Sequence, residues 1–258
     1  MGRKMVFFDL DGTLLDEDKR IVPSAKEAIH RLKDEGVAVA IATGRAPFMF
    51  AEFQKELGID AFVSFNGQYV VAGDDVVYKN PLNYEALTDL DRAADANGHP
   101  MVFLNHVEMR ATQPNHEYIE KSIGDLRFPY PQVDPGFYHG QDIFQALLFC
   151  RDKDESLYEA NKRGIEFIRW HDLSLDVIPE GGSKANGLKR LLQHFDIRRE
   201  DAYAFGDGLN DIQMLSYVGT GVAMGNAKDE TKQAADFVTR KMSEDGIVHG
   251  LQTLKLLG

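Results

Sequence analysis

The chain alternates short apolar runs with stretches in which apolar residues recur at helical spacing. The runs are nearly continuous, as expected for strands that a parallel sheet buries on both faces; they fall at residues 5–8, 37–42, 61–65, 202–205 and 221–224. Between the first two runs, a helical face ends at Gly36 (Ala25, Ala28, Ile29, Leu32). The pattern predicts an α/β fold built on a doubly wound parallel sheet.

The middle of the chain has a different pattern of apolar and polar residues. Residues 69–71 and 76–78 flank a Gly-Asp turn and predict a hairpin. From about residue 82 the segments are shorter and irregular, including an expected helix over 155–162 and a Pro-rich connection over 128–136. Strands and helices mixed in this way indicate an inserted α+β domain. We therefore expect a Rossmann-like core at 1–81 and 183–258, with an α+β cap domain at 82–182.

Composition narrows the class of protein. The 258 residues contain 43% hydrophobic and 27% charged residues, and the formal net charge is -12. An acidic chain of this kind argues against nucleic acid and anionic membranes as partners. It has no apolar run of 18 residues and no signal peptide, so a cytoplasmic location is expected. Its single cysteine, Cys150, excludes an internal disulfide and argues against a structural zinc site.

Polar residues follow the apolar runs where strands of a parallel sheet would end. They are Asp9 and Asp11, then Thr43 and Gly44, then Asp207, Asn210 and Asp211, with Lys184 at a helix start. A D-x-D-G stretch alone is more often an acidic turn. Four clusters at one sheet edge instead predict a shared crevice. Oxygen ligands without His or Cys suit Mg²⁺, and a lysine and a threonine beside it suit a phosphoryl group.

These residues carry a resemblance to a known family. Asp9-Leu10-Asp11-Gly12-Thr13, Thr43-Gly44-Arg45, Lys184 and the segment 206–211 resemble, in order and spacing, the four motifs of the haloacid dehalogenase superfamily in its phosphatase branch. By its position, the insert resembles the C2B cap of the Cof-type phosphatases. The motifs cover the core, whereas the similarity of the cap is positional only.

The resemblance implies a role for each matching residue. Asp9 would be the nucleophile that forms an aspartyl-phosphate. Asp11 would protonate the leaving alkoxide and later deprotonate water, while its backbone carbonyl joins Asp9 and Asp207 as a metal ligand. Asp211 would hold the metal loop or a metal-bound water. The phosphate would be bound by Leu10, Thr43, the amide of Gly44, Lys184 and Asn210.

Several residues keep a second interpretation. Thr43 could simply end a strand, and Asp211 could cap the helix that follows it. Arg45 and Asn66 could face the substrate, or could equally be a solvated arginine and a turn asparagine. Polar residues of the insert could contact the leaving group; they are Asn105, His106, Arg110, Gln113 and His116.

The favoured hypothesis is a Mg²⁺-dependent phosphatase of small phosphorylated metabolites, with sugar phosphates, nucleotides, pyridoxal phosphate and a flavin precursor all open as substrates. A phosphosugar mutase and a non-catalytic sugar-phosphate sensor are the alternatives. No helix carries a sustained heptad, so a monomer and a small homo-oligomer both remain open.

Overall fold

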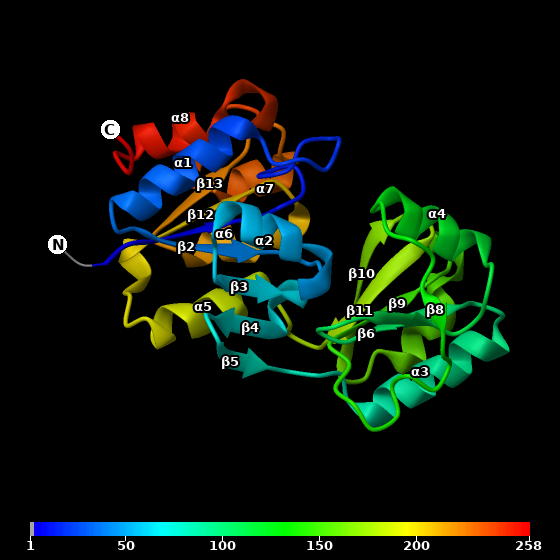
Figure 1. Cartoon of the computed structure of the whole chain (residues 1–258). Helices are drawn as coiled ribbons and strands as arrows, with labels where there is room; N and C mark the ends of the chain where they lie inside the picture. The colour runs from blue at the N-terminus through cyan, green and yellow to red at the C-terminus, as the bar shows by residue number, and fades with distance from the viewer. Residues whose placement is uncertain (1–2) are drawn as a thin grey trace. The chain divides into compact units, whose positions relative to one another are not determined.

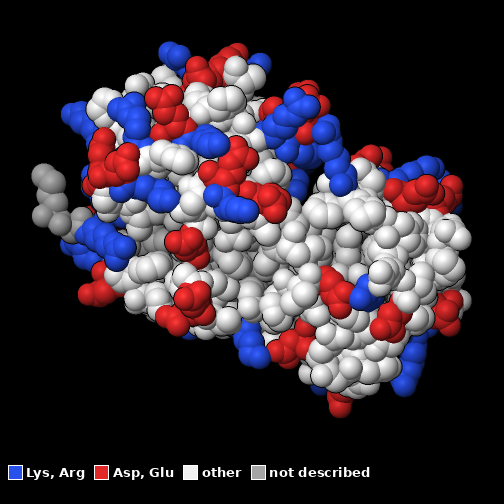
Figure 2. Space-filling view, in the orientation of Figure 1, with Lys and Arg blue, Asp and Glu red and all other residues white. Residues whose placement is uncertain are grey.

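The computed structural model describes residues 3–258, which pack as two compact units. Unit 1 comprises residues 3–45, 49–78 and 183–258, and unit 2 comprises residues 46–48 and 79–182. Within the described chain, no helix is both long and apolar enough to cross a bilayer. Acidic and basic side chains are interspersed over the face seen in Figure 2.

Unit 1 is built on an eight-stranded sheet in the order β14-β13-β12-β1-β2-β3-β4-β5. The strands from β14 to β3 are parallel, and β4 returns antiparallel to β3. The bounds are β1 Met5–Phe8, β2 Ala38–Ala42, β3 Ala61–Ser64, β4 Tyr69–Ala72, β5 Asp75–Lys79, β12 Ala202–Gly206, β13 Thr220–Ala223 and β14 Phe237–Val238. The predicted doubly wound α/β fold is confirmed, with an antiparallel edge at the expected hairpin.

Helices pack on both faces of this sheet (Figure 1). They are α1 Pro23–Asp34, α2 Ala51–Leu57, α5 Lys184–His194, α6 Ile212–Tyr217, α7 Asp229–Ala234 and α8 Gly246–Thr253, with short 3₁₀ turns η2 Phe65–Gly67, η4 Arg199–Asp201, η5 Leu209–Asp211 and η6 Met242–Glu244. The 3₁₀ turn η1 Pro47–Met49 falls mostly in unit 2. Alternate residues of β1 face opposite ways, as the pleat requires. Met5 and Phe7 join a core with α5 and α6, while Phe8 stacks on Phe205 at 5.1 Å.

Unit 2 has a six-stranded sheet in the order β10-β11-β9-β6-β7-β8, antiparallel except for the β7–β8 pair. Its elements are α3 Tyr84–Ala96, β6 Met101–Leu104, β7 Met109–Ala111, α4 Glu117–Asp125, β8 Gln132–Val133, β9 Gln145–Leu148, η3 Asp152–Asn161, β10 Ile165–His171 and β11 Ser174–Pro179. Residues of α3 pack with one face of this sheet in a second core.

One local expectation in unit 2 is wrong, and another is incomplete. The expected helix over 155–162 is a 3₁₀ helix that begins earlier, at Asp152, and only Tyr158 of it is buried. With so little apolar burial, packing cannot enforce α-helical geometry there. The Pro-rich connection contains the two-residue strand β8, which pairs with β7. The assignment of 82–182 as a cap stays a prediction.

Candidate active site

The centre of the unit 1 sheet brings the first and third motifs together. Phe8 of β1 pairs in register with Phe205 of β12, and the Asp9 N–H donates to the Phe205 carbonyl at 3.0 Å. The chain leaves β1 toward β2 on one side and returns later to build β12 on the other. Asp9 and Asp207 therefore both follow strands at the point where the strand order reverses, which is where doubly wound folds bind ligands.

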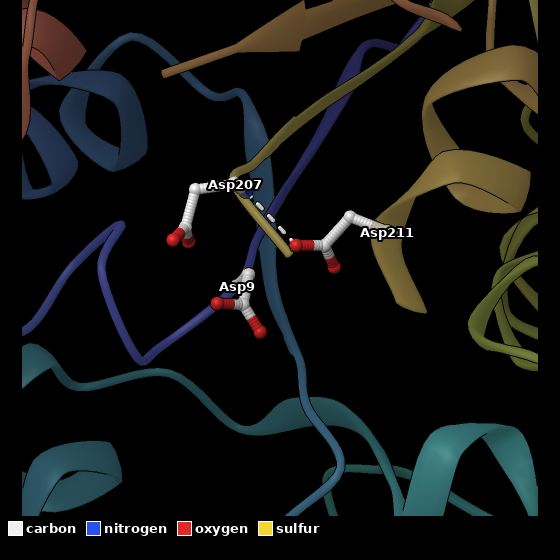
Figure 3. Close-up of side chains that lie close together, drawn as sticks. All are labelled: Asp9, Asp207 and Asp211. Atoms are coloured by element: carbon white, nitrogen blue, oxygen red, sulfur yellow. Dashed lines mark hydrogen bonds between the residues drawn. The ribbon is translucent and has the colours of Figure 1, made fainter. Parts of the chain in front are cut away.

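Three carboxylates converge at this point. One oxygen from each of Asp9, Asp207 and Asp211 lies within 4.8 Å of the others, and Figure 3 shows the three side chains close together, Asp9 from the segment after β1 and the other two from the loop after β12. Burial raises the pKa of Asp9 well above its ordinary value of 3.8, and repulsion by Asp211 and Asp207 adds to this against the attraction of Lys184. Burial and repulsion by Asp211 likewise raise the pKa of Asp207 to about 6.

Lys184 supplies one counter-charge to the cluster. It begins α5, where Ser183 caps the helix by accepting from the Asn186 N–H, and its side chain is fully buried. Its ammonium donates to Asp9 Oδ1 at 2.5 Å and to Asp211 Oδ1 at 2.6 Å. Burial opposes the charged form, yet the attraction of Asp211 and Asp9 raises the pKa of Lys184. One ammonium among three carboxylates leaves net negative charge.

The donor set fits a hard divalent cation. All three ligands are carboxylate oxygens, and a cation would relieve the repulsion that raises the pKa of Asp9 and Asp207. Thr13 donates its hydroxyl to Asp207 Oδ1 at 2.9 Å and fixes that carboxylate. Thr13 stands in the first motif, but no role for it was predicted from the sequence.

Asp211 stands at the N-cap position of α6, but its side chain does not cap that helix. Its side chain makes no cap hydrogen bond to α6. Its Oδ2 accepts from the Asp207 N–H at 2.9 Å and the Gly208 N–H at 2.8 Å, while its Oδ1 accepts from Lys184. The helix-cap interpretation is therefore wrong: Asp211 folds the loop after β12 and ties that loop to α5.

The second motif lies at the end of β2. Thr43 is buried, its Oγ1 accepts from the Arg45 N–H at 3.1 Å, and its carbonyl accepts from the Asn66 N–H at 3.1 Å. Among residues 3–258, no group accepts a hydrogen bond from the backbone N–H of Leu10 or Gly44. Two free amides near buried carboxylates and a lysine are suited to oxygens of an anionic ligand.

Arg45 and Asn66 are both buried, so a solvated Arg45 is excluded. Arg45 binds Asp11 with both arms of its guanidinium, Nε to Oδ2 and Nη2 to Oδ1, each at 2.7 Å. Asn66 has φ 51 in η2, and its Oδ1 accepts from Asn210 Nδ2 at 3.1 Å. The structure thus joins Asn66 to Asn210 and Arg45 to Asp11.

Asp11 stands apart from the carboxylate cluster. Lys19 also donates to its Oδ1, at 2.7 Å. Burial would raise the pKa of Asp11, but the hydrogen bonds and charges of Arg45 and Lys19 lower the pKa overall. Lys19 could not be identified from the sequence, because it lies in a polar turn outside the motifs.

The polar residues of unit 2 contact one another. Asn105 donates to Gln141 at 2.8 Å, Arg110 to Gln132 at 2.6 Å, and His116 Nδ1 accepts from the Tyr118 N–H at the start of α4. The Gln113 carbonyl accepts from Tyr130, and the His106 ring lies 6.3 Å from that of Phe144. Each therefore has a structural contact inside its own unit.

Comparison with known proteins places this geometry in a family. The family model for haloacid dehalogenase-like hydrolases matches residues 6–251. YkrA of Bacillus subtilis (strain 168), which is named only provisionally as a phosphatase, is 48% identical over 100% of both chains. The 5-amino-6-(5-phospho-D-ribitylamino)uracil phosphatase YitU of the same organism is 30% identical over 96% of both chains.

A solved structure agrees in fold along the whole chain. The subclass IIB sugar phosphatase BT4131 superposes with a TM-score of 0.88 at 32% identity, covering 98% of this chain and 100% of the other. The family resemblance drawn from the four motifs is confirmed. The chain belongs to the haloacid dehalogenase-like hydrolases, and it is a phosphatase of the Cof-type group within them.

Proposed function

We propose that the protein is a Mg²⁺-dependent phosphatase that hydrolyses small phosphorylated metabolites through an aspartyl-phosphate on Asp9. The observation that carries the proposal is the position of Asp9: it directly follows the central strand β1, contacts Lys184 at 2.5 Å and shares a cluster with Asp207 and Asp211. A buried carboxylate beside a buried ammonium is suited to meet a phosphate dianion, because the ammonium offsets the repulsion between the two anions.

The reaction has two steps with balanced proton transfers. Asp9 attacks phosphorus, the bond from phosphorus to the ester oxygen breaks, and protonated Asp11 gives its proton to the departing alkoxide. Water then attacks phosphorus, the bond to Asp9 breaks, and the Asp11 carboxylate takes a proton from the water. The Asp11 carboxylate is available for this work because it lies outside the cluster; Arg45 and Lys19 lower its pKa and so favour the ionised form that acts as base in the second step.

The remaining site residues hold the phosphate and the metal. Lys184, Thr43, Asn210 and the amides of Leu10 and Gly44 would bind phosphate oxygens. Asp9, Asp207 and the backbone carbonyl of Asp11 would hold Mg²⁺, and Asp211 would keep their loop in place. The metal would offset the negative charge that spreads over the phosphate oxygens during phosphoryl transfer.

The relatives support a polyhydroxylated alkyl ester as substrate. One is named for a sugar phosphatase, and another for a phosphoribityl compound. Both names describe a phosphate on a polyol chain, whose alkoxide is a poor leaving group and needs an acid such as Asp11. We propose that residues 82–182 act as the cap that selects this group, with core residues at 1–81 and 183–258. Arg45 and Asn66 remain candidates for contact with the substrate.

The test is phosphate release from a panel of sugar phosphates, nucleotides, pyridoxal phosphate and p-nitrophenyl phosphate. We expect release that requires Mg²⁺, stops with EDTA and is lost in Asp9→Asn. Lys26→Met is the control, because it removes only an exposed ion pair with Glu56. Conversion of a sugar phosphate to its isomer without free phosphate would indicate a mutase. Binding without any turnover would indicate a sensor.

A further inference from the structure

The Asp11 carboxylate is held by two cations from two parts of unit 1. Arg45, which follows β2, binds both oxygens in a fork. Lys19 binds Oδ1 at 2.7 Å from the turn that precedes α1. A forked arginine fixes the plane of a carboxylate, and a second donor from another element restricts the remaining rotation. The orientation of Asp11 thus depends on both elements.

Lys19 reaches Asp11 from an unfavourable backbone conformation. Leu15 pairs with Ile21, and the Lys19 N–H donates to the Asp16 carbonyl at 2.9 Å, which closes a tight turn. Lys19 has φ 58, the left-handed region that favours Gly or Asn and costs other residues about 1 kcal/mol. A lysine here is unfavourable for the turn itself, and its ammonium contacts a carboxylate of the site. Strained residues of this kind cluster at functional sites.

The space around Lys19 allows its side chain to be removed without damaging the core. An open pocket of about 1010 Å³ in unit 1 is bordered by Asp11, Lys19, Asn226 and Lys241. The Lys19 side chain is 28% exposed. Shortening it therefore enlarges a solvent-filled pocket and leaves no void among packed side chains.

We propose that Lys19 is a positioning residue that, together with Arg45, holds the Asp11 carboxyl in the orientation needed for proton transfer to the leaving oxygen. The proposal rests on the proposed function, in which Asp11 is the acid and base. Displacement of a reacting group by about 1 Å can cost a factor of about 100 in rate. Partial loss of orientation, with Arg45 still in place, should cost about tenfold.

The experiment compares two leaving groups. The nitrophenolate of p-nitrophenyl phosphate departs without an acid, whereas the alkoxide of the best sugar phosphate in the panel requires one. The ratio kcat/KM reports steps up to departure of the leaving group, so it isolates the acid role of Asp11. In Lys19→Asn we expect kcat/KM to fall about tenfold for the sugar phosphate and less than about twofold for p-nitrophenyl phosphate.

Three variants make the result specific. Lys19→Arg should restore the sugar phosphate activity, because it keeps a cation. Lys26→Met should match the wild type with both esters. Asn suits the left-handed conformation, so Lys19→Asn should melt at or above the temperature of the wild type. Two results would overturn the proposal and assign Lys19 to the turn alone. One is an equal fall in kcat/KM of Lys19→Asn with both esters. The other is the expected fall for the sugar phosphate together with a lower melting temperature.

Asp11→Asn separates this proposal from the proposed function. It should lower kcat/KM for the sugar phosphate by at least about 100-fold and affect p-nitrophenyl phosphate far less. If it lowers both equally, Asp11 is not the acid, and the proposed mechanism fails together with the role of Lys19. If Asp11→Asn is selective and Lys19→Asn is not, the mechanism stands and only the role of Lys19 is refuted.

Discussion

Replacing Lys184 with Met tests the electrostatics of the buried cluster. Methionine keeps an unbranched side chain of similar size and removes the ammonium, with its charge and its hydrogen bonds to Asp9 and Asp211. The exposed fractions are 0% for the Lys184 side chain, 8% for Asp9 and 1% for Asp211, so little water can solvate the carboxylates that lose their partner. Breaking a buried ion pair by removing one member costs about 3–5 kcal/mol. We expect a loss of that size at pH 8 without metal.

The loss should depend on pH with a definite sign. The pKa of Asp9 in the folded protein already lies above its ordinary 3.8, and loss of Lys184 raises it further. A carboxyl with a raised folded pKa destabilises the fold once it ionises, so the penalty is absent below about pH 4 and grows as pH rises. The stability gap between variant and wild type should therefore be smaller at pH 5 than at pH 8.

The assay is urea unfolding followed by far-UV circular dichroism, in EDTA, at both pH values. Lys26→Met provides the comparison, since an exposed pair contributes about 1 kcal/mol or less. A destabilisation by Lys184→Met that is equal at pH 5 and pH 8 would refute the argument from buried charge. A loss no larger than that of Lys26→Met would refute it as well.

Three further predictions concern the same loops. Gly12 has φ +83, and a Cβ there would lie 2.3 Å from Asp207 Oδ2. Gly12→Ala should therefore weaken Mg²⁺ binding and lower the melting temperature more than Gly36→Ala, where φ is +79 and the space is open. Equal effects of the two substitutions would contradict the predicted clash with Asp207. Because the pKa of Asp207 is raised to about 6, protons compete with the metal for this carboxylate below that pH. Mg²⁺ should therefore raise the melting temperature at pH 8 but raise it little at pH 5. An equal rise in melting temperature at both pH values would contradict this prediction. Asn210→Ala removes the hydrogen bond to Asn66 and a proposed phosphate contact. The KM measured by steady-state kinetics should rise about threefold to tenfold, while the stability of the protein stays similar. An unchanged KM would show that Asn210 does not bind the phosphate.

The fold could be predicted because its signals are local. Runs such as Met5–Phe8 and Ala202–Gly206 are apolar on both faces, which suits only strands that a parallel sheet covers on both sides. Parallel strands end at a common edge, so the sequence also predicted that Asp9 and Asp207 lie at the same edge of the sheet, although 198 positions separate them. Where burial is slight, as in η3, the sequence signal was weak and the predicted helix type was wrong.

The tertiary structure alone decided which side chains bind one another. The sequence identified Arg45 and Asp211, but only the fold pairs Arg45 with Asp11 and directs Asp211 to Lys184 and the loop after β12. It likewise brings Thr13 to Asp207 and Lys19 to Asp11. The physical reason is that apolar periodicity can be observed in consecutive residues of the sequence. The partner of a side chain depends instead on strand register and turn conformation, which form only when distant segments pack.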